Sequence, residues 1–343
     1  MMAGWGINKL PLFFATALLV FSSCVHRTAK IYLDDGFELR WNLANELEKL
    51  QKSVKLVSGI CYYRGYILSE SLKITTRETK VLNMGKFAVE KFYFNKNRSG
   101  SSVVIYSDAD KVLLVTCAHV IDFPDTLVRC YSVGRDRAGY VEAISYKEKQ
   151  ELYITELDGY DSVEVLLINR GLDIAFLLVH ISEEAINTVQ AIGCPYGNSS
   201  KLKLGSRVYI IGYPGGYKMI SSGVIGRVGS GAGESIVVDA PFNRGASGGA
   251  VVAIREDGQG LELIGLARSA SAEFLEFLVP AESYEFSDLE KVKPYSGEVY
   301  VERHPIIRYG ITLVIPINRI IEYMKEHADT FKSKGIGLNL SKL

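Results

Sequence analysis

The chain lacks an excess of charge of either sign. Its 343 residues include 39 lysines and arginines and 39 aspartates and glutamates, so the formal net charge is zero. Nothing in this balance indicates a nucleic-acid partner, because such proteins usually present a basic surface. The sequence also has no Cys-x-x-Cys pair, and it predicts no metal site and no cofactor. With 48% hydrophobic residues, the chain has an ordinary globular composition that can bury a large core.

Long apolar runs are scarce, and the clearest one lies at the N-terminus. Lys9 precedes an apolar run over residues 10–21, which is about the length of a signal-peptide core and short for a membrane span. The run ends in Ser22-Ser23-Cys24, which resembles a bacterial lipobox. We therefore expect residues 1–23 to be a lipoprotein signal peptide and Cys24 to be lipidated, in an exported protein held at a membrane facing the periplasm or the cell exterior. A plain signal peptide cleaved near Ser23, or a short anchor, is the alternative.

Cysteines are few, at five in the whole chain. With Cys24 set aside for the lipid, four remain that allow three pairings: Cys61, Cys117, Cys130 and Cys194. An exported chain could oxidise them. For Cys117, a packed free thiol and a bridge to Cys130 both stay open.

Short apolar runs separated by turn residues dominate the chain from residue 99 onward. This spacing predicts an all-β sandwich or barrel. Helical periodicity occurs at residues 41–54 and again at 316–327, and residues 59–68 read as a strand. The strands are expected at residues 103–105, 112–115, 163–168, 174–179, 207–211, 224–228, 235–238, 250–254, 261–266 and 311–315.

A single serine lies among glycines in Gly245-Ala246-Ser247-Gly248-Gly249, between two apolar runs. A nucleophilic serine needs two main-chain N–H groups aimed at the developing oxyanion, and glycine permits the backbone conformation that presents them. Two further residues lie at the ends of apolar runs, His119 after residues 112–115 and Asp173 before residues 174–178. The chain order is histidine, aspartate, serine, as in chymotrypsin.

These segments resemble those of the trypsin-like serine proteases, and among them the bacterial HtrA (DegP-type) branch. The resemblance covers roughly residues 90–328. Its core segments are T-x-A-H-V at residues 116–120, D-I-A-x-L at 173–177 and D-A-x-x-N-x-G-x-S-G-G-A at 239–250. Further matching segments are residues 99–105, 205–214, 263–266 and 315–318.

The resemblance implies two six-stranded antiparallel β-barrels, a short C-terminal helix and an N-terminal extension. His119 and Asp173 would come from the first barrel and Ser247 from the second, with an oxyanion hole made by the N–H groups of Gly245 and Ser247. The expected domains are an extension of unknown role at 24–90, a protease domain at 91–328 with insertions near 135–161 and 271–305, and a tail at 329–343. We expect no PDZ domain.

The expected activity is hydrolysis of polypeptide substrates through an acyl-enzyme. The substrate pocket is expected around Pro241, Phe242, Arg268, Ser269 and Ala270. Pro241 lies six residues before the serine, where trypsin has an aspartate, so the pocket should favour an apolar residue rather than lysine or arginine. Arg268 is the exception, because an inward-pointing cation would select an acidic residue.

Three other interpretations deserve comparison. Residues 245–249 also fit the G-x-S-x-G elbow of α/β-hydrolases, but that elbow needs a following helix and later acid and histidine partners. The residues after Ser247 read as a strand, and only His304 and His327 follow as histidines. The glycines at residues 229–233 lack the lysine of a nucleotide-binding loop, so a flexible turn is favoured. A third hypothesis is a resting or inactive protease domain that acts as a peptide-binding, chaperone-like surface lipoprotein.

Overall fold

The computed structural model describes residues 42–108, 110–131, 139–182, 189–229, 235–268, 272–280, 297, 299–307 and 310–338. The chain divides into two units, Met1–Asn42 and Leu43–Leu343, and almost all described residues belong to the second. The predicted signal peptide and Cys24 lie outside the described residues. None of the described helices has the length and apolar character needed to span a membrane.

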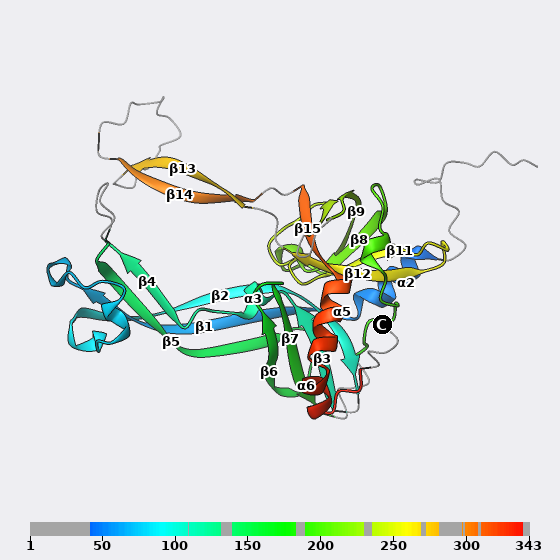
Figure 1. Cartoon of the computed structure of the whole chain (residues 1–343), viewed down its shortest axis with the longest axis horizontal. Coiled ribbons are helices and arrows are strands. Elements are labelled where there is room, and N and C mark those ends of the chain that lie inside the picture. Colours follow the sequence, from blue (N-terminus) through cyan, green and yellow to red (C-terminus); the bar gives the residue numbers. More distant parts are fainter. Residues whose placement is uncertain are drawn as a thin grey trace, which may run out of the picture. The chain divides into compact units, whose positions relative to one another are not determined.

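Seven antiparallel strands form a curled first sheet, in the spatial order β4-β5-β1-β2-β3-β7-β6 (Figure 1). Their bounds are β1 Val54–Leu68, β2 Ala88–Ser107, β3 Lys111–Thr116, β4 Thr126–Cys130, β5 Val141–Ile154, β6 Tyr160–Asn169 and β7 Ile174–Ile181. The strands β3 and β7 pair with each other and are buried along almost their whole length. Their continuous apolar runs therefore indicate strands that are covered on both faces.

A closed six-stranded barrel forms the second half, in the order β10-β15-β12-β11-β8-β9. Its strands are β8 Arg207–Gly212, β9 Met219–Arg227, β10 Ile236–Asp239, β11 Ala250–Ile254, β12 Leu261–Arg268 and β15 Ile311–Pro316. Small and branched side chains fill its interior, including Val208, Val238, Val251 and Ile264, each with no exposed surface. The predicted all-β double-barrel fold is confirmed, with a curled sheet of seven strands as its first half.

The first sheet includes strands from two segments that the sequence analysis describes as an N-terminal extension and as an insertion within the protease domain. The strand β1, which comes from the expected N-terminal extension of unknown role at residues 24–90, lies between β5 and β2. The strand β5 pairs with both β1 and β4, although residues 135–161 were expected to be an insertion. Neither segment carries a recognisable motif, because sheet strands need only a suitable pattern of burial and pairing partners.

Short helices connect and close the two halves. They are α2 Leu43–Gln51, α3 Ala118–Ile121, α5 Ile317–Glu326 and α6 Ala328–Ser333, with 3-10 turns η1 Glu70–Leu72, η2 Glu78–Lys80, η3 Met84–Lys86, η4 Ser199–Lys201 and η5 Pro214–Gly216. The expected closing helix is present as α5, which buries Ile317, Ile320 and Met324. Two rings from these C-terminal helices, Tyr323 and Phe331, pack on Phe176 of β7.

A two-stranded sheet of β13 (Ala272–Pro280) and β14 (Val299–Ile307) falls within the predicted insertion at 271–305. This segment therefore contains regular antiparallel structure of its own. It pairs with neither the first sheet nor the closed barrel among the described strands.

Candidate active site

His119 lies in α3, a single helical turn that directly follows β3. Thr116 ends the strand, and its hydroxyl donates to the carbonyl of Ser101 on β2 over 2.7 Å. Cys117 is extended and precedes the helix, and the N–H of Ala118 donates to the carbonyl of Asp173 over 3.0 Å. The histidine therefore leaves a rigid strand on a turn that is attached to the aspartate segment by its own backbone.

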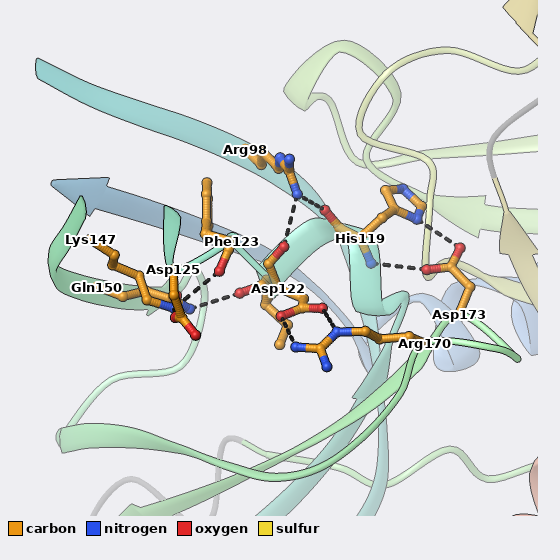
Figure 2. Close-up of polar contacts among 10 residues, drawn as sticks. Arg98, His119, Asp122, Phe123, Asp125, Lys147, Gln150, Arg170 and Asp173 are labelled. Atoms are coloured by element: carbon orange, nitrogen blue, oxygen red, sulfur yellow. Dashed lines mark hydrogen bonds and ion pairs between the residues drawn. The ribbon is translucent and has the colours of Figure 1, made fainter. Parts of the chain in front are cut away.

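Asp173 lies in the turn between β6 and β7 and adopts a left-handed conformation with φ of 61°. That conformation is unfavourable for a residue with a Cβ, and it persists only where surrounding contacts hold it. Its Oδ1 accepts from the backbone N–H of His119 at 2.9 Å, and its Oδ2 lies 2.8 Å from Nδ1 of the same residue (Figure 2). This double contact orients the imidazole, so that Nδ1 carries a proton toward the carboxylate and Nε2 is available as a base.

The loop before β11 carries Ser247 between two glycines with positive φ. Gly245 has φ of 98°, and a Cβ there would lie 2.2 Å from the carbonyl oxygen of Tyr213. Gly248 has φ of 85°, and a Cβ there would lie 2.0 Å from the carbonyl oxygen of Ser101. Real side chains do not tolerate such distances, so only glycine fits either position.

Backbone hydrogen bonds hold this loop against its surroundings. The carbonyl of Ser247 accepts from the N–H of Ser101 at 2.7 Å, and the carbonyl of Arg244 accepts from the N–H of Gly215 at 2.7 Å. Within the described parts of the chain, no hydrogen bond uses the N–H of Gly245 or of Ser247. No internal hydrogen bond therefore competes for the two donors predicted for the oxyanion hole, and both residues are buried in the structure.

Ser101 was missed by sequence reasoning, although it falls in the matched segment 99–105. Its side chain is fully buried, and its hydroxyl accepts from the N–H of Tyr213 at 2.8 Å and donates to the carbonyl of Gly245 at 2.7 Å. It links β2 of the first sheet to the serine loop of the second barrel. A serine among other small polar residues of β2 gives no signal of this role until the two halves are brought together.

The structure brings the serine loop next to the histidine segment. A Cβ on Gly248 would lie 2.6 Å from Oγ1 of Thr116 and 3.1 Å from the nitrogen of Cys117, two residues before His119. Among the described residues, no hydrogen bond joins the Ser247 hydroxyl to the His119 ring. Bonds between nucleophile and base are often long in ligand-free sites and shorten when substrate binds.

The residues predicted for the substrate pocket occupy different environments. Pro241 is exposed, whereas Phe242 is 3% exposed and packs in the core of the second barrel. Arg268, at the end of β12, has Nε 3.5 Å from Oδ2 of Asp173. Its charge is thus directed to the aspartate. Ser269 and Ala270 lie outside the described residues.

Cys117 lies close to the same pair of residues. One potential ligand atom from each of Cys117, His119 and Asp173 lies within 4.8 Å of the others. Burial raises the pKa of the Cys117 thiol well above its ordinary value, and its Sγ–H donates to the carbonyl of Ala267 at 3.4 Å. A metal ligand would have to be the thiolate, so this environment favours a packed thiol over a metal site.

All four cysteines of the described residues are free thiols. Cys61 and Cys117 are buried, Cys194 is partly buried and Cys130 is exposed. Of the two alternatives for Cys117, the structure therefore favours the packed thiol. Burial also raises the pKa of Cys194 to about 12, which keeps that thiol protonated and unreactive at neutral pH.

Comparison with solved structures gives matches among HtrA-type proteases. AlgW with tripeptide matches at 18% identity and a TM-score of 0.43, over 84% of this chain and 64% of that one. A serine endoprotease from Yersinia pestis matches at 18% identity and a TM-score of 0.40, over 84% of this chain and 67% of that one. Deg5 matches at 19% identity and a TM-score of 0.35, over 66% of this chain and 83% of that one.

No curated protein matches the sequence significantly. The chain spans less than two thirds of the length of AlgW. The family model of the trypsin-like peptidase domain matches residues 100–266, a range that includes His119, Asp173 and Ser247. Residues 100–266 are thus identified as a trypsin-like peptidase domain.

Proposed function

We propose that the protein is a serine endopeptidase that hydrolyses polypeptides with His119, Asp173 and Ser247. The observation that carries this proposal is the double contact of the Asp173 carboxylate with the backbone N–H and the ring of His119. The glycine-bounded loop of Ser247 and the match to the peptidase family support it.

In the proposed reaction, Ser247 Oγ attacks the scissile carbonyl and His119 Nε2 accepts the hydroxyl proton. The proton then passes to the leaving amine as the peptide bond breaks and an acyl-enzyme forms. A water molecule, deprotonated by the same imidazole, hydrolyses the ester and regenerates the serine. The N–H groups of Gly245 and Ser247 would stabilise the oxyanion in both steps.

Labelling with a fluorophosphonate probe tests the assignment directly. The wild-type protein should be labelled at Ser247 and should cleave unfolded protein substrates. Ser247→Ala should prevent labelling, and both Ser247→Ala and His119→Ala should reduce turnover by about 10⁶-fold, because triad members act as a unit. Wild-type turnover in Ser247→Ala would exclude this mechanism.

A resting or inactive domain that binds peptides is the second candidate. The absence of a Ser247–His119 hydrogen bond among the described residues is the observation that favours it. A protein that never reacts with the probe, with or without added peptide, yet binds unfolded polypeptides would support this alternative. Labelling that increases when a peptide is added would indicate a resting enzyme instead.

Substrate preference is proposed to favour a small or medium apolar residue on the acyl side of the cleaved bond. Pro241 offers no counter-charge for a lysine or arginine, and the Arg268 charge is directed toward Asp173. A peptide-library cleavage profile tests this proposal. Dominant cleavage after lysine or arginine would contradict it, and dominant cleavage after aspartate or glutamate would indicate that Arg268 turns toward the substrate.

Export and lipid anchoring at Cys24 remain a proposal from the sequence. Cys24→Ala should move the mature protein from the membrane fraction to the soluble fraction. An unchanged membrane fraction would place the anchor elsewhere.

A further inference from the structure

The turn that carries His119 has carbonyl groups that its own helix leaves without partners. With only four residues, α3 cannot bond most of them internally. One side chain of β2 binds two backbone carbonyls of this segment. Arg98 Nη1 donates to the carbonyl of His119 at 2.7 Å and to the carbonyl of Asp122 at 3.1 Å (Figure 2). The Arg98 guanidinium also lies 4.9 Å from the ring centre of Phe123. Its position is therefore fixed by two hydrogen bonds and one ring contact.

Two side chains of β5 complete this set of bonds. Gln150 donates to the carbonyl of Ile121 at 2.7 Å, and Lys147 donates to the carbonyl of Phe123 at 3.0 Å. Side chains from the neighbouring strands β2 and β5 thus hold four carbonyl groups of this segment, those of His119, Ile121, Asp122 and Phe123.

The Asp122 side chain makes the connection to the aspartate turn. Arg170 donates to it twice, from Nε at 2.5 Å and from Nη2 at 3.0 Å. Asp122 lies three residues after His119, and Arg170 lies three residues before Asp173. The Asp122–Arg170 and His119–Asp173 contacts therefore join the same two turns at two points, as Figure 2 shows.

We propose that Arg98, Asp122 and Arg170, termed the Asp122 cluster, are positioning residues that set the separation and orientation of the His119 and Asp173 turns. The inference rests on the proposed serine endopeptidase function. Within the described residues, no hydrogen bond or ion pair joins any of the three side chains to the His119 ring or the Asp173 carboxylate, so they act through the backbone.

The cluster is poorly suited to a role in stability alone. In the Arg170–Asp122 pair the arginine side chain is 78% exposed and the aspartate 20%, and ion pairs with one solvent-exposed partner contribute little to the free energy of unfolding. The catalytic rate depends much more strongly on the position of the catalytic groups, because a displacement of about 1 Å can lower the rate by up to about 10²-fold. Loss of the cluster should therefore lower turnover far more than it lowers stability.

The test compares Arg170→Ala with Arg129→Ala in the full-length protein. Arg129 makes a similar two-point contact with Glu142 between β4 and β5, with both distances 2.9 Å, and the Arg129 side chain is 66% exposed. We expect Arg170→Ala to lower kcat about tenfold at unchanged KM and with a thermal midpoint within about 2 °C of the wild type. Arg129→Ala should match the wild type. A kcat for Arg170→Ala within twofold of the wild type, or equal losses in both variants, would overturn the inference.

Exchanging the charges of Asp122 and Arg170 tests whether the contact between them, rather than the arginine itself, is what turnover requires. The double variant Asp122→Arg with Arg170→Asp should recover kcat to within about threefold of the wild type, whereas Asp122→Arg alone should fall at least as far as Arg170→Ala. No recovery in the double variant counts against the inference. A wild-type protein that neither reacts with fluorophosphonate nor cleaves substrate refutes the proposed function, whereas an active wild type with an unaffected Arg170→Ala refutes only this inference.

Discussion

The two parts of the candidate active site are held by different kinds of contact. On the histidine and aspartate side, charged side chains do most of the positioning: Arg98 binds backbone carbonyls, Arg170 binds Asp122, and Asp173 binds both His119 and Arg268. On the serine side, backbone groups and a buried hydroxyl hold the loop, and two glycines with positive φ leave no room for a Cβ.

This difference has a consequence for how each side responds to substitution. A side-chain contact can be lost while the backbone keeps its path, so single changes on the histidine side should have graded effects. A closely packed backbone cannot keep its path when a side-chain atom is added, because the added atom must displace a whole segment. The largest effects are therefore expected at the glycines of the serine loop.

Gly248→Ala should have the largest effect. The new Cβ would lie 2.0 Å from the Ser101 carbonyl oxygen, in a backbone conformation that disfavours a side chain. We expect activity to be lost and the free energy of unfolding to fall by about 2–4 kcal/mol. Gly205→Ala is the matched control, because Gly205 has a similar φ of 79° but no atom within 4 Å of its Cβ position. It should cost about 1 kcal/mol and retain activity. Similar losses in both variants would show that backbone strain alone matters.

Ser101→Ala should have the next largest effect. It removes a buried hydroxyl that bonds Tyr213 and Gly245 and leaves both backbone groups without that partner. We expect a loss of about 1–3 kcal/mol in unfolding free energy and at least a tenfold loss in kcat, through displacement of the oxyanion donor. Ser102→Ala is the control, since that hydroxyl is equally buried but donates once, to the carbonyl of Lys55 at 3.2 Å. A larger loss of kcat in Ser102→Ala would contradict the assigned role.

Arg268→Ala should have a smaller effect on turnover. Asp173 keeps its two contacts with His119 when the guanidinium, 3.5 Å away, is removed. We expect kcat/KM to fall less than about fivefold, because the guanidinium is partly exposed to solvent and lies at the long end of ion-pair distances. The cleavage profile should show no loss of acidic substrates, because Arg268 pairs with Asp173. A selective loss of cleavage after aspartate or glutamate would place Arg268 in the substrate pocket.

The smallest effect, on the pH dependence of stability, is expected at an ion pair that links the turn after β5 to the loop before β9. Glu156 forms an ion pair with Lys218. Burial raises the pKa of Glu156, but hydrogen bonds from Lys218 and Tyr213 outweigh it and leave the pKa below its ordinary value. Nearby Lys55 is 4% exposed, and burial lowers its pKa.

A carboxyl with a lowered pKa stabilises the folded state above the pKa of the unfolded chain, about 4.3 for glutamate, and this contribution is lost as the pH falls through the folded value. The stability advantage of the wild type over Glu156→Gln should therefore shrink between about pH 5 and pH 3. Denaturant unfolding at several pH values measures it, with Glu142→Gln as a control on the first sheet. An advantage that grows toward low pH would contradict the assigned shift.

Much of the architecture could be predicted because its signals are local. The apolar runs at residues 112–115, 174–179, 250–254 and 261–266 each fall within a strand, and the periodicity after Pro316 corresponds to α5. Gly245 and Gly248, on either side of Ser247, have the positive φ that glycine permits. Such features depend on the conformational preferences of residues that are neighbours in the sequence, so the sequence alone is enough to predict them.

Other features depend on residues that meet only in the folded chain. Nothing in the sequence indicated that β1 and β5 would lie side by side, that all four described cysteines would be free, or that Arg268 would face Asp173. Arg98, Asp122 and Arg170 are ordinary polar residues until two turns about fifty residues apart come together. Histidine, aspartate and serine motifs could be read in chain order, because each is a short local pattern. Their separation and the supporting charges were decided by tertiary packing, because a contact between distant segments leaves no trace in the local pattern of either one.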